Sequence, residues 1–462
     1  MPASPARKIA FEILERVETA NAFAANLLQA RLTDKMKRAD AALATELVLG
    51  VIRQRRLLDF LLARHITKSQ SKLDTAVRIA LRMGIYQLRF CERIPARAAV
   101  DESVELVKQA KKSSATSLVN AVLRRAAGEG KQPAEKFLPQ NISRAERLGI
   151  LHSHPTWLVE RWLARFGESR TRALLEANNR AASAAIANHA PERRKEIEAS
   201  LSKVGAHFAP GHLLRGALRI QGGNAARSEA FRKGWISLQD EASQAIPLLL
   251  SVRPGNSVLD LCAAPGGKTA ALAGAGRLVV ACDIRLHRLR AMRRQMARLN
   301  LGGIHLLACD ATKPLPIARK FDRILVDAPC TGTGTLAGNP EIRWRLRLED
   351  LAELREKQSA ILSSALAHLA PGGRLIYSTC SLEPEENEQV VLEAIRNFPG
   401  ARIVQRETLS RELAPLLAAG LEAGAFFDEA DAFRTLPSLH HTDGFFAVAM
   451  ENREIAGAET EC

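Results

Sequence analysis

Cysteine is scarce in this chain of 462 residues, and its few copies are far apart. The seven cysteines are Cys91, Cys262, Cys282, Cys309, Cys330, Cys380 and Cys462. No two of them form a Cys-x-x-Cys pair, the spacing typical of zinc clusters, and an odd, scattered set does not build a disulfide framework. We therefore expect no metal site and no structural disulfides, and any cysteine with a function acts as a thiol.

Long hydrophobic runs are also missing. No stretch reaches the roughly 18 uncharged apolar residues that a membrane-spanning helix needs. The N-terminus runs directly into an amphipathic segment with Glu12 and Glu15 and has no apolar core of a signal peptide. We therefore expect a cytoplasmic protein without a membrane contact. Its 47% hydrophobic and 25% charged residues are typical of globular proteins, and its length favours two or three domains.

Acidic residues are too few to balance the basic ones. The chain has 66 lysines and arginines against 50 acidic residues, a net charge of +16. Residues 1–127 hold 23 basic and 12 acidic residues, so a quarter of the chain carries +11 of this excess. A basic surface favours a polyanionic partner, because each neutralised phosphate releases counterions. The charge therefore indicates nucleic acid, without distinguishing RNA from DNA.

The apolar spacing changes along the chain and predicts its domains. In residues 1–127 apolar residues recur every three or four positions, as at Ile9, Ile13 and Val17, which predicts an all-α domain of about six helices. Residues 128–153 have the Gly, Lys, Pro and Asn content of a linker. Residues 154–245 mix helical and strand patterns, residues 246–452 alternate strands with helices, and residues 453–462 form a tail.

The region 246–452 predicts a doubly wound, mostly parallel sheet. We expect its strands at 257–262, 278–283, 304–309, 323–327, 374–378 and 444–450. Ligands of such sheets bind at the carboxyl ends of the strands. The residues with chemical potential are found at these ends.

The first strand runs into a turn of small residues, Cys262-Ala263-Ala264-Pro265-Gly266-Gly267-Lys268. The Gly-Lys-Thr ending suggests a phosphate loop, but that motif requires glycine where Cys262 stands, and the dinucleotide fingerprint is absent. The turn fits the amino-acid end of S-adenosylmethionine. Asp283 ends the second strand, where an acid can accept both ribose hydroxyls, and Asp310 ends the third, where one can meet the adenine amine.

The next two strands each end in a loop that contains a thiol. The fourth runs into Asp327-Ala328-Pro329-Cys330 and the fifth into Thr379-Cys380-Ser381. A lone buried cysteine is often only a small apolar side chain. Two of them at neighbouring strand ends indicate reactive groups that share one cleft.

These loops resemble the signatures of the RNA cytosine-C5 methyltransferases: an Ala-Pro-Gly-Gly-Lys turn, an Asp-Ala-Pro-Cys loop and a Thr-Cys-Ser loop. The resemblance continues at His154-Pro155, at Trp235–Asp240 and at Asp443-Gly444-Phe445-Phe446. Residues 1–127 are similar to a NusB-type RNA-binding domain at Glu46–Val51 and Val119–Arg124. The match spans nearly the whole chain. It implies a NusB-like all-α domain followed by an α/β, Rossmann-like class I methyltransferase domain.

The resemblance also implies roles for single residues. The segment Cys262, Ala263, Ala264, Pro265, Gly266, Gly267 and Lys268, together with Asp283, Asp310 and Asp327, matches the family's S-adenosylmethionine contacts. Cys380 matches the nucleophile and Cys330 the cysteine that helps to release the product. In the implied reaction, Cys380 adds to carbon 6 of cytosine, which makes carbon 5 nucleophilic enough to take a methyl group, while Asp327 contacts the ring.

The resemblance is greatest to bacterial enzymes with a fused NusB-like domain, which act on 16S ribosomal RNA. We therefore expect an RNA-binding, monomeric enzyme that forms 5-methylcytosine in 16S rRNA. Two alternatives stay open: the same reaction on transfer RNA, and a catalytically silent RNA-binding or ribosome-assembly factor. DNA cytosine-C5 enzymes lack the Thr-Cys-Ser loop, and adenine amino-methyltransferases carry Asn/Asp-Pro-Pro-Tyr where this chain has Asp-Ala-Pro-Cys.

One segment departs from the family pattern. Relatives often carry Arg-Arg before the Pro-Asp/Glu-Ile sequence, whereas this chain reads Leu336-Ala337-Gly338-Asn339-Pro340-Glu341-Ile342. The loss of two charges weakens the expected contacts of this segment with the target RNA, for which Arg343 and Arg345, directly after it, could substitute.

Overall fold

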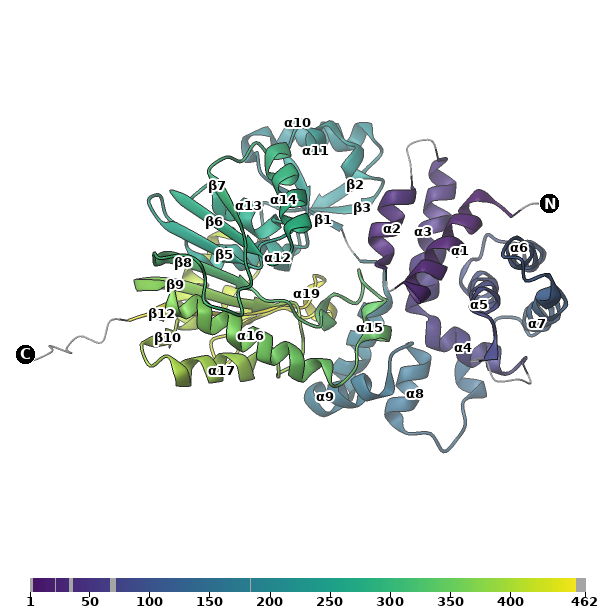
Figure 1. Ribbon diagram of the computed structural model, residues 1–462. Coiled ribbons are helices and arrows are strands. Elements are labelled where there is room, and N and C mark those ends of the chain that lie inside the picture. The colour runs from purple at the N-terminus through teal and green to yellow at the C-terminus, as the bar shows by residue number, and fades with distance from the viewer. Residues whose placement is uncertain (1–2, 21, 33–35, 67–71, 183, 454–462) are drawn as a thin grey trace, which may run out of the picture. The chain divides into compact units, whose positions relative to one another are not determined.

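The computed structural model describes residues 3–20, 22–32, 36–66, 72–182 and 184–453. The chain forms two compact units, Met1–Ala181 with Leu336–Arg345, and Ala182–Thr335 with Leu346–Cys462 (Figure 1). Almost all of the expected tail at 453–462, and with it Cys462, lies outside the described residues. The five-part division that the sequence suggests stays a prediction.

The first unit is helical, as the sequence predicts for residues 1–127. Its NusB-like part consists of α1 (Pro5–Thr19), α2 (Ala24–Arg31), α3 (Arg38–Arg53), α4 (Arg55–Ala63), α5 (Thr75–Phe90), α6 (Ala96–Gln109) and α7 (Thr116–Gly128). The described residues thus hold seven helices where about six were expected. Only Gln54 separates α3 from α4, with no proline or glycine to mark the break.

The close approach of α3 and α5 explains the Glu46–Val51 motif. A Cβ atom on Gly50 would lie 2.1 Å from the ring of Tyr86, so no larger residue fits without a shift of the ring. The Tyr86 hydroxyl donates a hydrogen bond to Glu46, one turn before Gly50. Gly50 therefore allows the contact, and Glu46 holds the polar end of the ring that fills it.

Three more helices complete the first unit: α8 (Arg144–Leu151), α9 (Thr156–Asn179) and α15 (Ile342–Arg345). The sequence predicts two helices over residues 156–179, and α9 is kinked at Gly167, where φ is 72° and ψ is 176°. The short helix α15 belongs to the segment 336–345, which packs in this unit although the chain on both sides of it belongs to the second.

The second unit begins with a small antiparallel sheet. Its strands are β1 (Ala184–Asn188), β2 (His207–Pro210), β3 (Leu218–Gly222) and β4 (Ile236–Leu238), in the order β2-β3-β1-β4. The helices α10 (Arg194–Lys203) and α11 (Glu229–Arg232) pack on it through Ile197, Leu201 and Ala230. The sequence predicts a short strand at 183–189, and the structure has a strand, β1, over Ala184–Asn188 of this stretch, while His189 lies beyond it.

The main sheet confirms the predicted doubly wound fold. Its strands are β5 (Ser257–Leu261), β6 (Leu278–Asp283), β7 (Ile304–Ala308), β8 (Phe321–Asp327), β9 (Leu369–Thr379), β10 (Ala401–Ile403), β11 (Phe433–Arg434) and β12 (Phe446–Asn452). The order is β10-β12-β9-β8-β5-β6-β7, with β11 paired to β12. Strands β5 to β9 pair in parallel, whereas β12 runs antiparallel to β9 and β10.

Alternate residues of each strand build two cores, one on each face of this sheet. On one face, Leu259 and Tyr377 pack with α16 (Asp350–Ala367) and α17 (Glu388–Asn397) (Figure 1). On the other, Val258 and Ile376 pack with α12 (Glu241–Ala245) and α18 (Arg406–Leu413). The helices α13 (Gly267–Ala273) and α14 (Leu286–Arg298) lie on this second face, and α19 (Pro437–His440) precedes β12.

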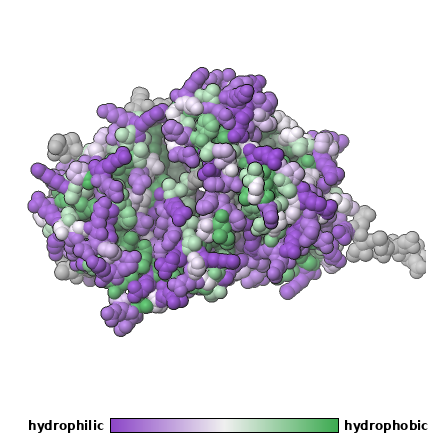
Figure 2. All heavy atoms as spheres, turned by 180° about the vertical axis from the view of Figure 1, so that it is seen from behind, coloured by the Kyte–Doolittle hydropathy of each residue, from purple (hydrophilic) through white to green (hydrophobic). Residues whose placement is uncertain are grey.

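Hydrophilic side chains cover most of the face in Figure 2, and the hydrophobic residues between them form small patches. This distribution is normal for a protein whose large apolar side chains are inside. No helix among the described residues is both long and apolar enough to cross a membrane.

Candidate active site

The parallel strands bring the predicted site residues to one edge of the main sheet. Asp283 and Asp327 end β6 and β8, and Asp310 follows β7 by two residues. Cys380 directly follows β9. Because these strands run in parallel, their carboxyl ends share one edge, where ligands of such folds bind.

The turn after β5 has a backbone that depends on its sequence. Cys262 has a φ of 70°, and its neighbour Ala263 donates a backbone hydrogen bond to the carbonyl of Cys282, at 2.7 Å. Gly266 has a φ of 102°, and a Cβ on it would lie 2.8 Å from Met296 and 2.9 Å from Met292. Gly266 is thus required both for its left-handed conformation and for its close contact with α14.

Two acids beside this turn keep oxygen atoms available to a ligand. Asp283 is 3% exposed, and its Oδ1 accepts from the Arg285 amide at 2.8 Å. Arg288 lies 3.1 Å from Oδ2, but Oδ2 accepts no hydrogen bond among the described residues. Asp310 accepts from the amide and hydroxyl of Thr312 through Oδ1, which lowers the pKa of Asp310. An unsatisfied buried carboxylate oxygen fits a ribose hydroxyl that donates to it.

Asp260, within β5, is an acid of the site that was not among the predicted residues. It is 1% exposed and accepts a hydrogen bond from the Thr269 hydroxyl at 2.5 Å, while its Oδ1 has no partner among the described residues. Burial raises the pKa of Asp260 to about 7, and the nearby charge of Asp327 adds to this effect. The signal was available in the sequence, because a charged residue inside a buried apolar strand is rare.

Lys268 and Asp327 form an ion pair at the centre of the edge. The Lys268 Nζ lies 2.7 Å from Oδ2 of Asp327, and the Ser378 hydroxyl donates to Oδ1 at 3.0 Å. The same ammonium lies 4.8 Å from the centre of the Phe445 ring. This arrangement fixes the carboxylate of Asp327 between two donors from different elements.

The two predicted thiols meet directly. The Sγ atoms of Cys330 and Cys380 are 3.3 Å apart, within hydrogen-bond distance. The hydrogen bond with Cys380 and burial raise the pKa of Cys330 well above its ordinary value. Either Sγ can donate this hydrogen bond.

A buried glutamate to which the sequence assigned no role joins the two cysteine loops. Oε1 of Glu386 accepts from the Thr331 amide at 2.8 Å and from the Gln358 side chain at 3.0 Å. Oε2 accepts from the hydroxyls of Thr331 and Ser381. Thr331 follows Cys330 and Ser381 follows Cys380, so one carboxylate binds both neighbours of the thiol pair, and burial raises its pKa.

Two further acids, Asp240 and Asp443, lie next to each other, and Asp443 lies near Lys268. The backbone amide of Asp443 donates to Oδ2 of Asp240 at 3.1 Å, and Asp240 also caps α12. Burial and the neighbouring negative charge raise the pKa of both carboxyls, and for Asp443 the charge of Lys268 opposes this effect. Both acids belong to motifs noted in the sequence, although neither was assigned a role there.

The expectation that Arg343 contacts the target RNA is wrong. Its side chain is 0% exposed in the first unit, where it donates to the carbonyls of Ser153, Asn178 and Leu336 and to the side chain of Asn179. Arg345 donates to the carbonyls of Val17 and Ala22. Both arginines anchor the segment 336–345. The position of a charged residue in the sequence therefore did not predict its function here.

The edge of the second unit thus has the architecture of a Rossmann-like methyltransferase with two adjacent thiols. Comparison with family models agrees. Residues 247–451 match the 16S rRNA methyltransferase RsmB/F family, residues 4–128 the NusB family, and residues 154–226 the RsmF/B-like ferredoxin-like domain.

Named relatives match most of the chain. It is 30% identical to the probable ribosomal RNA small subunit methyltransferase B of Bacillus subtilis, over 98% of this chain and 100% of that protein. It is 36% identical to the ribosomal RNA small subunit methyltransferase B of Pseudomonas putida, over 80% and 84%. The crystal structure of PH0851 covers 97% of this chain and 99% of its own, with a TM-score of 0.78 and 25% identity. The chain belongs to the RsmB/F family of rRNA methyltransferases.

Proposed function

We propose that the protein methylates carbon 5 of a cytosine in 16S rRNA, with S-adenosylmethionine as methyl donor and Cys380 as nucleophile. The observation that carries the proposal is the 3.3 Å contact between Cys330 and Cys380 at the edge where cofactors of this fold bind. Methylation of a base nitrogen needs no thiol, whereas methylation of cytosine carbon 5 needs one to activate the ring.

The cofactor site we propose is the segment Cys262, Ala263, Ala264, Pro265, Gly266, Gly267 and Lys268 with Asp283, Asp310 and Asp327. Oδ2 of Asp283, which faces Arg288 at 3.1 Å but accepts no hydrogen bond among the described residues, suits a ribose diol. Oδ2 of Asp310 suits the adenine amine, since both hydrogen bonds of Asp310 use Oδ1. S-adenosylmethionine, when bound, supplies an electrophilic methyl group on sulfur.

The chain's own residues then handle the cytosine. Cys380 Sγ forms a bond to carbon 6, and the displaced electron pair of the ring makes carbon 5 nucleophilic. Asp327, held by Lys268 and Ser378, accepts from the amine of the ring. After methyl transfer, a base takes the proton from carbon 5, the electron pair of that C–H bond forms the double bond between carbons 5 and 6, and Cys380 leaves carbon 6 as a thiolate. Cys330, whose Sγ lies 3.3 Å from that of Cys380, assists this release by donating a hydrogen bond to the departing thiolate.

The test is incubation with methyl-labelled S-adenosylmethionine and either deproteinised, unmodified 16S rRNA or transfer RNA, followed by identification of the labelled nucleoside. Wild type, Cys380→Ala and Cys330→Ala are compared. We expect label in 5-methylcytidine of 16S rRNA, no label with Cys380→Ala, and a protein–RNA adduct that accumulates with Cys330→Ala.

Other outcomes choose between the alternatives. Label in transfer RNA alone would mean that the substrate is transfer RNA instead of 16S rRNA, with the proposed reaction unchanged. Retained RNA binding with no label in either RNA would favour a silent binding factor. The match to the NusB family and the names of the relatives support the ribosomal substrate.

A further inference from the structure

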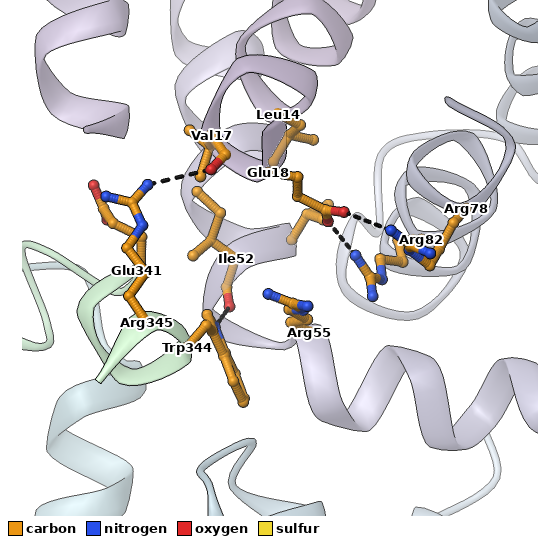
Figure 3. A pocket seen from close by; sticks show the side chains of 11 residues that line it. Leu14, Val17, Glu18, Ile52, Arg55, Arg78, Arg82, Glu341, Trp344 and Arg345 are labelled. Carbon is orange, nitrogen blue, oxygen red and sulfur yellow. Dashed lines mark hydrogen bonds and ion pairs between the residues drawn. The ribbon is translucent and has the colours of Figure 1, made fainter. Parts of the chain in front are cut away.

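A cavity of about 280 Å³ lies in the first unit, between helices of the NusB-like part and the segment 336–345 (Figure 3). It is lined by α1, α3, α4 and α5 and by Glu341, Trp344 and Arg345. Small-molecule pockets measure roughly 300–1,000 Å³, so this cavity is just below that range and has room for a small group such as a phosphate. None of its residues belongs to the proposed methyl-transfer site.

The polar residues of the cavity are basic in excess. Glu18 pairs with both Arg78 and Arg82, as Figure 3 shows, and Asp59 also pairs with Arg82 at 2.6 Å. Four arginines at the cavity, Arg55, Arg78, Arg82 and Arg345, carry four positive charges, and Glu18, Glu341 and Asp59 carry three negative charges. One positive charge is left over.

That charge is on Arg55. In the part of the chain that the structure describes, no hydrogen bond or ion pair joins the Arg55 guanidinium to another residue, and in Figure 3 it lies beside Trp344 with no dashed line. The Nε of Arg78 is buried and also has no partner among the described residues. The carboxylates of Glu18 and Asp59 act on Arg55 without a direct ion pair, and burial together with the charge of Arg82 outweighs them, so the pKa of Arg55 is lowered.

The orientation of Arg55 is nevertheless fixed. Its Cζ lies 5.6 Å from the centre of the Trp344 ring, a cation–π contact. The ring itself cannot turn freely, because its Nε1 donates to the carbonyl of Ile52 at 2.7 Å. A fork of donors held rigidly at a cavity wall is suited to bind a planar or tetrahedral oxyanion.

We propose that this cavity, the Arg55 pocket, binds one phosphodiester of the RNA substrate, with Arg55 as the main cation and Arg78 as the second. A phosphodiester carries one negative charge, which matches the single uncompensated positive charge, whereas a phosphomonoester carries about −1.5 to −2. The excess of +11 over residues 1–127 attracts a polyanion to the same domain. The inference rests on the proposed RNA substrate and assigns it a contact away from the reacting base.

The test measures binding of the full-length protein to deproteinised 16S rRNA at several KCl concentrations. We expect Arg55→Gln to weaken binding about tenfold and to lower the slope of log Kd against log [KCl] by about 0.7–0.9, the value for one lost phosphate contact. Arg55→Lys keeps the charge, so it should keep the slope and lose only part of the affinity. Arg97→Gln is the matched control, because it removes one charge from a side chain that is 93% exposed.

Two further measurements distinguish an RNA contact from a structural role of Arg55 and from a site for free phosphate. Without RNA, Arg55→Gln should unfold at the same temperature as wild type or a higher one, because it removes an uncompensated charge; a lower temperature would show that Arg55 is structural and overturn the proposal. Inorganic phosphate at constant ionic strength should not compete with RNA. If phosphate competes with RNA in wild type but not in Arg55→Gln, and the salt slope of RNA binding is the same in both proteins, the pocket is a site for free phosphate.

Equal salt slopes for Arg55→Gln and Arg97→Gln would also overturn the proposal. Binding is scored without methyl transfer, so the two proposals fail separately. If Arg55→Gln and Arg97→Gln have the same salt slope while methylation is normal, only the pocket proposal is rejected. If binding depends on Arg55 but no methylation occurs, only the proposed reaction is rejected.

Discussion

At the scale of single residues, the site depends on groups whose protonation is set by what surrounds them. Cys330 and Cys380 have the same side chain and lie 3.3 Å apart, and their hydrogen bond together with burial raises the pKa of Cys330 well above its ordinary value. In the proposed reaction the two identical thiols have different tasks, with Cys380 as the nucleophile and Cys330 as the group that assists its release. Sequence spacing could pair them, but only the coordinates of their neighbours distinguish them.

Asp260 allows a pH test of this description. Its pKa is about 7 in the folded chain against an ordinary 3.8, so between these values the folded chain holds a proton that the unfolded chain has lost. Stability due to this group is therefore complete below pH 3.8 and falls as pH rises to about 7, by at most about 4 kcal/mol. Asp260→Asn cannot ionise and should lose this dependence.

The measurement is the free energy of unfolding in urea at pH values from about 4.5 to 8. The stability of Asp260→Asn relative to wild type should increase with pH through this window and then stay constant. Glu429→Gln, at an exposed position, is the control and should show no such trend. A flat difference for Asp260→Asn would contradict the raised pKa.

At the scale of elements, the site is formed by loops that follow β8 and β9, and Glu386 holds those loops together. Glu386→Ala leaves the Thr331 amide without an acceptor, at a cost of about 1–3 kcal/mol, and leaves the Gln358 side chain with the Pro329 carbonyl as its remaining acceptor. Displacing a reacting group by about 1 Å can lower a rate about 100-fold, so we expect a loss of that order in kcat. KM for S-adenosylmethionine should stay nearly constant, since Glu386 does not contact the turn at 262–268.

Glu386→Gln tests whether the hydrogen bonds of this side chain, and not its charge, hold the two cysteine loops in position. It keeps an oxygen for the two N–H donors, and the hydroxyls of Thr331 and Ser381 can turn to accept from its amide, so most of the activity should remain. Glu422→Gln on the surface serves as the neutral comparison. An equal loss of kcat in Glu386→Ala and Glu422→Gln would show that the hydrogen bonds of Glu386 have no influence on the thiols.

The elements themselves were largely predictable from the sequence. Strands β5 and β6 end within a residue of their predicted limits, because buried apolar runs end at a turn of small residues or at an acid. Strands β10 and β11 were missed, since runs of three and two residues carry no periodicity. The sequence contains Glu386 and Asp443 but could not predict their roles, because the function of a carboxylate depends on hydrogen-bond donors from distant parts of the chain.

At the scale of the whole molecule, the sequence predicted consecutive domains, whereas the chain returns once to its first unit. The segment 336–345 follows the Cys330 loop by a few residues, yet it packs on the helices near the N-terminus. Ala24 donates its backbone amide to Glu341, and Arg53 donates to the carbonyl of Ala337. Such a return leaves no trace in hydrophobic spacing, which reports only local structure.

Arg343 is the residue on which this return depends most. Its two terminal nitrogens donate to four oxygen atoms, at 2.8 to 3.3 Å, from Ser153, Asn178, Asn179 and Leu336. Arg343→Met leaves these buried acceptors without donors, so we expect the free energy of unfolding of the first unit to fall by about 3 kcal/mol or more. Arg343→Lys has one nitrogen in place of the fork, so it should recover only part of this loss.

Three of the four tryptophans, Trp157, Trp162 and Trp344, lie in the first unit, so urea unfolding followed by tryptophan fluorescence reports mainly on that unit. Arg347→Met is the control, because the Arg347 side chain is 68% exposed and, among the described residues, forms its ion pair with the nearby Asp350. A stability change for Arg343→Met no larger than that of the control would mean that the segment is not anchored there. The expected order, from most to least stable, is Arg347→Met, Arg343→Lys and Arg343→Met, since each step removes more donors from the same buried oxygens.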